Sequence, residues 1–316
     1  MSLAADEPKL SPTADAIGRL VDFVRASVVV RDETLRLAVV AMLARGHVLL
    51  EDVPGVGKTL MARTLAAAIG GEFHRVQFTA DLLPADITGG SVYDQSTGNF
   101  HFRPGPIFAN VVLADEINRG TPRAQASLLE AMGEGHVSVD GETHPLPAPF
   151  MVLATQNPID QHGTFPLPES ELDRFAMLLR LGRPNEAQAR EILRRHQHAQ
   201  PSPEGSAVLD LQTILAMQQE VLGVHVSDAL QAYVAAITLA TREHPRVGLP
   251  ASPRASVALL RCAQSMAVYH GRRHALPDDV KAVATSVLGH RLAVAGADPE
   301  TVVLEVLDLV PVPVGV

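Results

Sequence analysis

Residues 47–60 carry the groups that proteins use to bind phosphate. A short apolar run, 47–50, leads into a turn with two glycines, and Lys58 and Thr59 then open a helical pattern. In such a loop the backbone groups converge on phosphate oxygens, where the helix dipole also favours negative charge. We predict that Lys58 neutralises the β- and γ-phosphates of a nucleotide and that the Thr59 hydroxyl ligates Mg²⁺. The candidate nucleotide-binding residues are Pro54, Gly55, Val56, Gly57, Lys58, Thr59 and Leu60.

The loop departs from the general pattern G-x-x-x-x-G-K-[ST] at one position. Asp52 stands five residues before Gly57, where the first glycine of the pattern belongs. Taken alone, the segment could therefore also be an ordinary strand-to-helix turn with a lysine on the surface. A second motif is needed to decide between these alternatives.

The second motif is a pair of carboxylates, Asp115 and Glu116, that follows the apolar run 111–114. A continuous apolar run of this length is typical of a strand buried on both faces of a parallel sheet, and ligands of such sheets bind at the carboxyl ends of the strands. We predict that Asp115 holds Mg²⁺ through water and that Glu116 activates the water that attacks the γ-phosphate. Alone, the pair could be the acidic start of a helix, but together with the phosphate loop it indicates nucleotide hydrolysis.

Three further polar residues are candidates for contact with phosphate. Asn157 ends the next apolar run, where its amide could hold a water or a γ-phosphate oxygen, or simply form an Asn-Pro turn. Arg174 and Arg254 could bind phosphate oxygens through the planar guanidinium group. The alternatives are an ion pair of Arg174 with Asp173 or Glu171, and a surface helix cation at Arg254.

The composition excludes several other functions. A formal net charge of −9, with no Trp and only 4% aromatic residues, argues against nucleic acid as the main partner. The single cysteine, Cys262, excludes an intrachain disulfide, and the 13 histidines show no metal-ligand spacing. The chain lacks a signal sequence and an apolar run long enough for a membrane span, so we expect a soluble, cytoplasmic protein.

The order of the apolar patterns predicts an α/β fold in two domains. Strand patterns alternate with helices up to residue 181, which indicates a three-layer αβα domain with a central parallel sheet over 15–181, after a flexible tail at 1–14. Within it we expect an insertion at 83–106 and a hairpin at 136–144, where Asp140-Gly141 is a strong turn signal. Residues 182–316 form a helical domain with helices at 185–197, 209–222, 227–242, 252–270 and 277–288, and a strand-like or extended end at 303–316.

The motifs together resemble the AAA+ ATPases and, among these, the MoxR family. The resemblance is carried by residues 49–59, 114–119, 125–132, 154–158, 165–169, 172–175 and 252–255, in the order in which the family has them. The strings Asp-Glu-Ile-Asn-Arg at 115–119 and Leu-Leu-Glu-Ala-Met at 128–132 are much more specific than the phosphate loop. The matching residues cover the chain from about 28 to 290.

The resemblance implies ATP and Mg²⁺ as cofactors and an αβα core followed by a helical lid. It places 83–106 as the insertion in helix 2 and 136–144 as the hairpin before sensor 1. The implied site residues are the phosphate-loop residues Lys58 and Thr59, the strand-end carboxylates Asp115 and Glu116, Asn157 as sensor 1, Arg174 as arginine finger and Arg254 as sensor 2.

The function implied by this resemblance is ATP hydrolysis in a ring, expected to be a hexamer, that remodels or matures a partner protein. The family suggests a partner with a von Willebrand factor A-type domain. An arginine finger from a neighbouring subunit would make hydrolysis depend on assembly. Two alternatives remain open, a nucleotide-gated binding switch in which hydrolysis is incidental and a DNA-associated motor.

Overall fold

The computed structural model describes residues 12–52, 55–157, 163–197 and 206–313. The candidate residue Pro54 lies outside these ranges, as do residues 1–11 of the expected N-terminal tail and the last three residues of the chain. The first helix, α1, spans Pro12–Ser27, so the described part of the expected tail is already helical.

A five-stranded parallel sheet forms the centre of the molecule, in the strand order β2-β5-β8-β1-β9. Its strands are β1 (Val48–Glu51), β2 (Phe73–Gln77), β5 (Val111–Asp115), β8 (Met151–Gln156) and β9 (Met177–Leu179). Alternate residues of one strand point to opposite faces. Val112 accordingly packs in one hydrophobic cluster and its neighbour Leu113 in the other, and both are fully buried. The continuous apolar runs are strands covered on both faces, as predicted.

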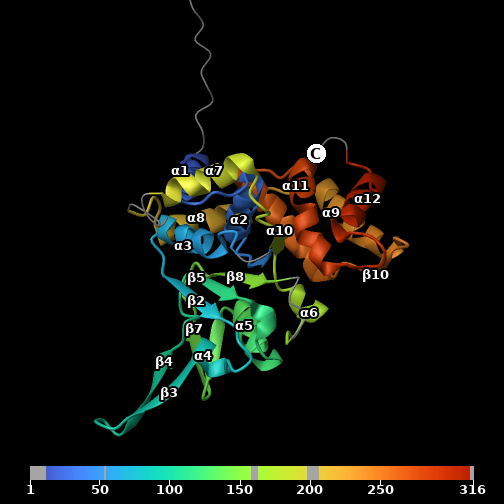
Figure 1. The fold of residues 1–316 in the computed structure, drawn as a ribbon. Helices are drawn as coiled ribbons and strands as arrows, with labels where there is room; N and C mark the ends of the chain where they lie inside the picture. Colours follow the sequence, from blue (N-terminus) through green and yellow to red (C-terminus); the bar gives the residue numbers. More distant parts are fainter. Residues whose placement is uncertain (1–11, 53–54, 158–162, 198–205, 314–316) are drawn as a thin grey trace, which may run out of the picture.

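Helices cover both faces of this sheet and produce the predicted three layers (Figure 1). Helices α1, α2 (Asp32–Leu43) and α3 (Lys58–Ala68) lie on one side. Helices α4 (Pro84–Thr88) and α5 (Pro122–Glu134) lie on the other. The phosphate loop therefore connects strand β1, which lies between β8 and β9, to a helix of the first layer.

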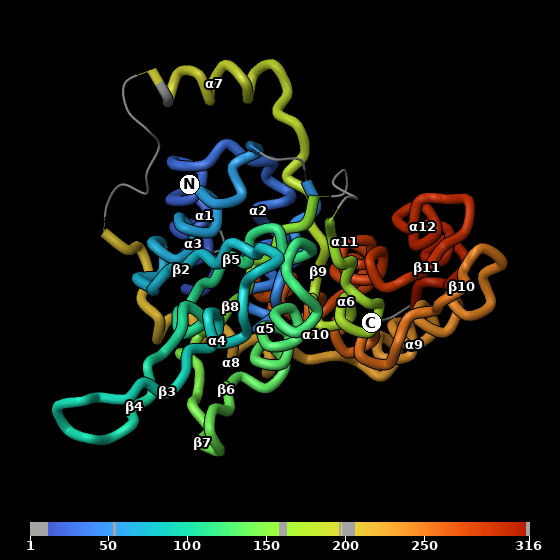
Figure 2. Tube along the Cα trace, turned by 60° about the horizontal axis from the view of Figure 1, so that its bottom comes forward, coloured from blue at the N-terminus to red at the C-terminus, as the bar shows by residue number. Residues whose placement is uncertain are grey.

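Two antiparallel hairpins leave this body where insertions were expected. Strands β3 (Gly89–Asp94) and β4 (Asn99–Pro104) follow α4 and project away from the rest of the molecule in Figures 1 and 2. Strands β6 (His136–Val139) and β7 (Glu142–Pro145) are joined by Asp140-Gly141, which have φ of 51° and 85°. Positive φ at both turn residues is what a tight two-residue hairpin requires.

The second half of the chain is mainly helical. After the short α6 (Glu169–Leu172) and β9, the five expected helices are present as α7 (Glu186–His196), α8 (Leu211–Leu222), α9 (Asp228–Glu243), α10 (Pro253–Tyr269) and α11 (Pro277–Leu288). Two short strands, β10 (Val247–Leu249) and β11 (Ala293–Val294), pair antiparallel and so join the segment before α10 to the segment before α12. Several of these helices share one hydrophobic cluster with α1–α3. In the described part of the chain, no helix is both long and apolar enough to cross a membrane.

The prediction of a strand-like or extended end at 303–316 was wrong for most of its described residues, because α12 spans Pro299–Leu309. Its valines favoured a strand, since β-branched residues have low helix propensity. In the fold, Val302, Val303 and Val306 form a helical stripe that is completely buried. The free energy gained by burying three such side chains, roughly 1.5 kcal/mol or more each, exceeds the propensity cost of a few tenths.

Candidate active site

The phosphate loop lies between β1 and α3 and is shaped by two glycines. Gly55 and Gly57 have φ of 87° and 96°, a region that other residues rarely adopt. Lys58 is the first residue of α3, so the unpaired N–H groups of the first helical turn are available to an anion. A cavity of about 600 Å³, a size typical of small-molecule sites, lies over this loop. Its lining includes six of the seven candidate nucleotide-binding residues, Gly55, Val56, Gly57, Lys58, Thr59 and Leu60.

Lys58 is half-buried at the start of α3. Its Nζ donates a hydrogen bond of 2.8 Å to the carbonyl oxygen of Asp52. Burial lowers the pKa of Lys58 from its ordinary value near 10.5, while the carboxylates of Asp52, Asp115 and Glu116 oppose this change. Arg63, Arg75 and Arg195 also line the cavity, so its cationic side chains outnumber the lining carboxylates Asp115 and Glu116.

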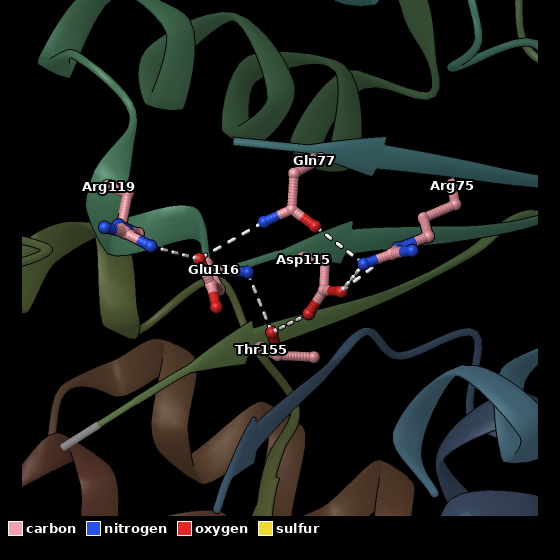
Figure 3. A network of polar contacts seen from close by, with 6 residues as sticks. All are labelled: Arg75, Gln77, Asp115, Glu116, Arg119 and Thr155. Atoms are coloured by element: carbon pink, nitrogen blue, oxygen red, sulfur yellow. Dashed lines mark hydrogen bonds and ion pairs between the residues drawn. The ribbon is translucent and has the colours of Figure 1, made fainter. Parts of the chain in front are cut away.

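The predicted carboxylate pair lies at the carboxyl end of β5, beside the loop. Asp115 is the last residue of the strand, and Glu116 follows in the left-handed conformation with φ of 56°. Thr155 of β8 connects the two, since its hydroxyl donates to Asp115 Oδ1 at 2.6 Å and accepts from the Glu116 backbone N–H at 2.8 Å (Figure 3). Thr155 therefore orients the Asp115 carboxylate and holds the backbone at Glu116.

Side chains from β2 and from the turn after Glu116 hold the outer oxygens of both carboxylates (Figure 3). Arg75 donates to Asp115 Oδ2 through Nη2 at 2.6 Å and Nε at 3.1 Å. Gln77 Nε2 and Arg119 Nη1 donate to Glu116 Oε2 at 3.2 and 3.0 Å. Our reading of the sequence missed Arg75, Gln77 and Thr155. Arg75 and Gln77 are two positions apart in the alternating pattern of β2, so their side chains share one face of the strand. This shared face was the signal by which the sequence could have shown them.

The residues present fit a nucleotide with Mg²⁺. A Cβ added to Gly55 or Gly57 would meet no atom within 4 Å, so the loop leaves open space for phosphate oxygens. The Thr59 hydroxyl and the Asp115 carboxylate line the same cavity. Mg²⁺ is usually held by one or two carboxylates together with substrate phosphates. Among the described residues no group of three or more His, Cys, Asp or Glu could hold a metal by itself.

The cavity lining also includes residues from two segments far apart in sequence. Ser27 is the last residue of α1 and is followed by Val28 and Val29, whereas Ile192 and Arg195 belong to α7. Arg195 Nη1 donates to the carbonyl oxygen of Ala26 at 2.9 Å and so ties α7 to the end of α1. Both views place α7 on the α1 side of the molecule (Figures 1 and 2). The apolar side chains of Val28, Val29 and Ile192 suit a flat aromatic base.

The structure brings some of the predicted site residues together and leaves two apart. Lys58, Thr59, Asp115, Glu116 and Asn157 all line the cavity, whereas Arg174 and Arg254 do not. Arg174 Nη1 donates to the carbonyl oxygen of Leu129 in α5, at 3.0 Å.

Arg254 is exposed near the start of α10. The two arginines lie in the same region, because their neighbours Asp173 and Ser252 are joined by a hydrogen bond of 2.8 Å. Arg174 and Arg254 therefore lie near each other and outside the cavity lining.

A phosphate loop next to strand-end carboxylates on a parallel sheet defines a nucleotide-binding protein of the P-loop class. Residues 47–177 match the family described as "ATPase family associated with various cellular activities (AAA)", and residues 239–307 match the AAA lid domain.

Similar proteins agree with this class over nearly the whole chain. The uncharacterised protein YeaC of Bacillus subtilis is 45% identical over 304 residues, which cover 94% of this chain and 95% of YeaC. Chaperone MoxR1 of Mycobacterium tuberculosis is 40% identical and covers 96% of this chain, with 84% of MoxR1 matched. A crystal structure of an ATPase candidate from Cytophaga hutchinsonii superposes with a TM-score of 0.89 at 35% identity, covering 95% of this chain and 96% of that one. The chain belongs to the MoxR family of AAA+ ATPases.

Proposed function

We propose that this protein hydrolyses ATP to ADP and phosphate with Mg²⁺, and that it does so in a ring, a hexamer, that remodels or matures partner proteins. One observation carries the proposal. Lys58, Thr59, Asp115, Glu116 and Asn157 come from three separate segments of the chain and line a single cavity of about 600 Å³. These are the cation, the metal ligands, the base and the polar amide that hydrolysis of a phosphoanhydride needs.

Each of these residues has a distinct task in the proposed reaction. Lys58 and the N–H groups of the first turn of α3 neutralise the phosphates, while Thr59 and Asp115 hold the metal. When bound, Mg²⁺ would stabilise the negative charge that develops on the phosphate oxygens. Glu116 orients the attacking water and accepts its proton, and Asn157 positions that water or a γ-phosphate oxygen.

Assembly into a ring would add an arginine from a neighbouring subunit to the cations that already line the cavity, Lys58, Arg63, Arg75 and Arg195. Arg174 and Arg254 lie outside that cavity, which supports a role at the nucleotide of a neighbouring subunit. An arginine delivered in this way can raise the hydrolysis rate by about 10³- to 10⁵-fold. Hydrolysis would then require contact between subunits.

The proposed work of the ring is remodelling of a partner protein with a von Willebrand factor A-type domain. The proposal is supported by the chaperone name of the relative MoxR1, at 40% identity over most of the chain. The net charge of −9 makes nucleic acid a weak alternative. The cytoplasmic location expected from the sequence remains a prediction, which fractionation of cells would test.

Substitution Glu116→Gln tests the proposed reaction. The amide cannot accept the proton, so we expect phosphate release from Mg-ATP to fall by roughly 10²- to 10⁴-fold. Nucleotide binding, measured by equilibrium fluorescence, should persist. Glu243→Gln, at an exposed position at the end of α9, is the matched control and should hydrolyse ATP normally. Unchanged hydrolysis in Glu116→Gln would contradict the assignment of the base.

The same variant separates an ATP-driven machine from a nucleotide-gated switch. A machine should hold ATP and its partner and fail to release or remodel the partner, whereas a switch should keep full partner function. Capture of proteins on the Glu116→Gln variant, followed by mass spectrometry, would identify the partner. Binding to DNA that weakens steeply as salt rises would support the DNA motor instead.

A further inference from the structure

Asp52, which replaces the first glycine of the general phosphate-loop pattern, is buried with only 9% of its surface exposed. Its carboxylate accepts two backbone hydrogen bonds, from the Leu181 N–H to Oδ2 at 2.5 Å and from the Gly182 N–H to Oδ1 at 3.1 Å. Burying a carboxylate is costly unless such bonds compensate for the lost water. A glycine at this position could make neither bond.

The backbone N–H groups of Leu181 and Gly182 belong to the segment that connects the end of β9 to α7. The opposite side of the same segment is also held, because Arg31 donates to the carbonyl oxygens of Arg180 at 2.7 Å and of Leu181 at 3.2 Å. The direction of the chain between β9 and α7 is therefore set from both sides, by Asp52 of the phosphate loop and by Arg31 at the start of α2.

The main chain of Asp52 makes the second connection. Its carbonyl oxygen accepts the hydrogen bond from Lys58 Nζ, the predicted phosphate-binding cation. The segment that its carboxylate holds leads into α7, where Ile192 and Arg195 line the same cavity. One residue thus contacts the predicted phosphate-binding cation and the segment that leads into α7.

We propose that Asp52 is a positioning residue that couples the phosphate loop to α7, so that nucleotide contacts at Lys58 and at α7 are made together. The inference rests on the proposed function, because it assigns the cavity to a nucleotide. With glycine at position 52 the two bonds to the Leu181 and Gly182 N–H groups would be lost, which leaves the Glu51–Arg180 ion pair and the pairing of β1 with β9 between the two segments. The loop and α7 would then move more independently.

Nucleotide affinity provides the first test, with Asp52→Gly and Asp52→Asn. Asp52→Gly creates the general phosphate-loop pattern. If the loop needs only a backbone that is compatible with this pattern, the Asp52→Gly variant should bind ADP as tightly as the unaltered protein or more tightly. Coupling predicts instead that both variants bind a fluorescent ADP analogue roughly ten- to a hundredfold more weakly, the effect of losing hydrogen bonds to a charged group.

Asp210→Asn is the matched control, because Asp210 also accepts a backbone hydrogen bond, from the Thr213 N–H at 2.7 Å, at the start of α8. We expect it to change ADP affinity less than about twofold. Affinity of Asp52→Gly equal to that of the unaltered protein would overturn the proposal.

Distances within the full chain provide the second test, and they need no nucleotide. Spin labels at Leu193→Cys in α7 and Glu130→Cys in α5 occupy exposed positions. The only native cysteine, Cys262, is buried, which raises the pKa of its thiol to about 12 and keeps it from reacting. Asp52→Gly should broaden the distance distribution in the nucleotide-free protein, whereas Asp210→Asn should not.

The outcomes of the two tests are distinct. A residue that only stabilises the fold would lower the melting temperature without broadening the distances, and that result overturns the coupling. If the unaltered protein binds no nucleotide, the proposed function fails, yet the distances in the nucleotide-free variants still decide whether Asp52 holds α7 in place.

Discussion

Lys58 is the cation that we propose binds the phosphates of the nucleotide, and its burial sets the pH range in which its charge is kept. Burial lowers the pKa of Lys58 below its ordinary value, and a polyphosphate binds the protonated form. Affinity should therefore fall as the pH rises through the lowered pKa, by about tenfold per pH unit, and the fall should begin at a lower pH than for an exposed lysine.

The measurement is the dissociation constant of a fluorescent ADP analogue between neutral pH and about pH 10. Lys58→Arg is the control, because a guanidinium group stays charged throughout this range. We expect the variant to lose most of the pH dependence. The same profile in both proteins would assign the dependence to another group.

At the scale of elements, His47 joins three parts of the core. Its Nδ1 accepts from the Val152 N–H at 3.0 Å, so the proton is on Nε2, which lies 3.1 Å from the carbonyl oxygen of Met132. The residue thereby ties the start of β1 to β8 and to α5. Burial lowers the pKa of His47 from 6.5 to about 4, so the imidazole stays neutral where an exposed histidine would gain a proton.

This neutral histidine makes the stability of the core depend on pH. Above about pH 6.5 the folded and unfolded states are both neutral at His47, and its contribution to stability is fully present. As the pH falls from 6.5 toward 4, only the unfolded state gains the proton, and about 3 kcal/mol of the free energy of unfolding is lost.

Urea unfolding at several pH values between 6.5 and 4 would measure this loss. His47→Gln should make stability less dependent on pH, although it lowers stability at neutral pH. His101→Gln, at an exposed position in β4, should leave the dependence unchanged. His290, whose pKa burial lowers to about 3, contributes in the same direction, so some dependence should remain in His47→Gln.

For the whole molecule, the position of Arg174 leads to a test of assembly. Arg174→Ala should lower the rate of ATP hydrolysis by about 10³-fold or more. Nucleotide binding should stay intact, because the Arg174 side chain does not line the cavity. Dilution that dissociates the ring should have a similar effect on the unaltered protein.

Mixing two inactive variants distinguishes a neighbour's arginine from the subunit's own. Arg174→Ala subunits keep Glu116, and Glu116→Gln subunits keep Arg174, so about a quarter of the interfaces in a randomly mixed ring would be complete. We expect hydrolysis to reappear on mixing in proportion to these interfaces. No recovery from mixed rings of confirmed composition would show that Arg174 does not act in trans.

The sequence by itself determined the αβα core, the helices at 185–288 and several of the residues that line one cavity, among them Lys58, Asp115 and Asn157. These features depend on local patterns: apolar runs that must be buried on both faces, glycines that permit positive φ, and carboxylates at strand ends. Because the carboxyl ends of parallel strands meet at one edge of the sheet, Lys58, Asp115 and Asn157 could be placed together without knowledge of the strand order.

Only the tertiary structure decided which side chains hold these groups. Arg75 reaches Asp115 because β2 is paired with β5, and Asp52 binds amides 129 and 130 residues away because β1 is paired with β9. It also decided that α12 is a helix, since burial of its valines outweighs their preference for strands. Hydrogen-bond partners and burial depend on strand order and packing, which connect residues that no local pattern relates.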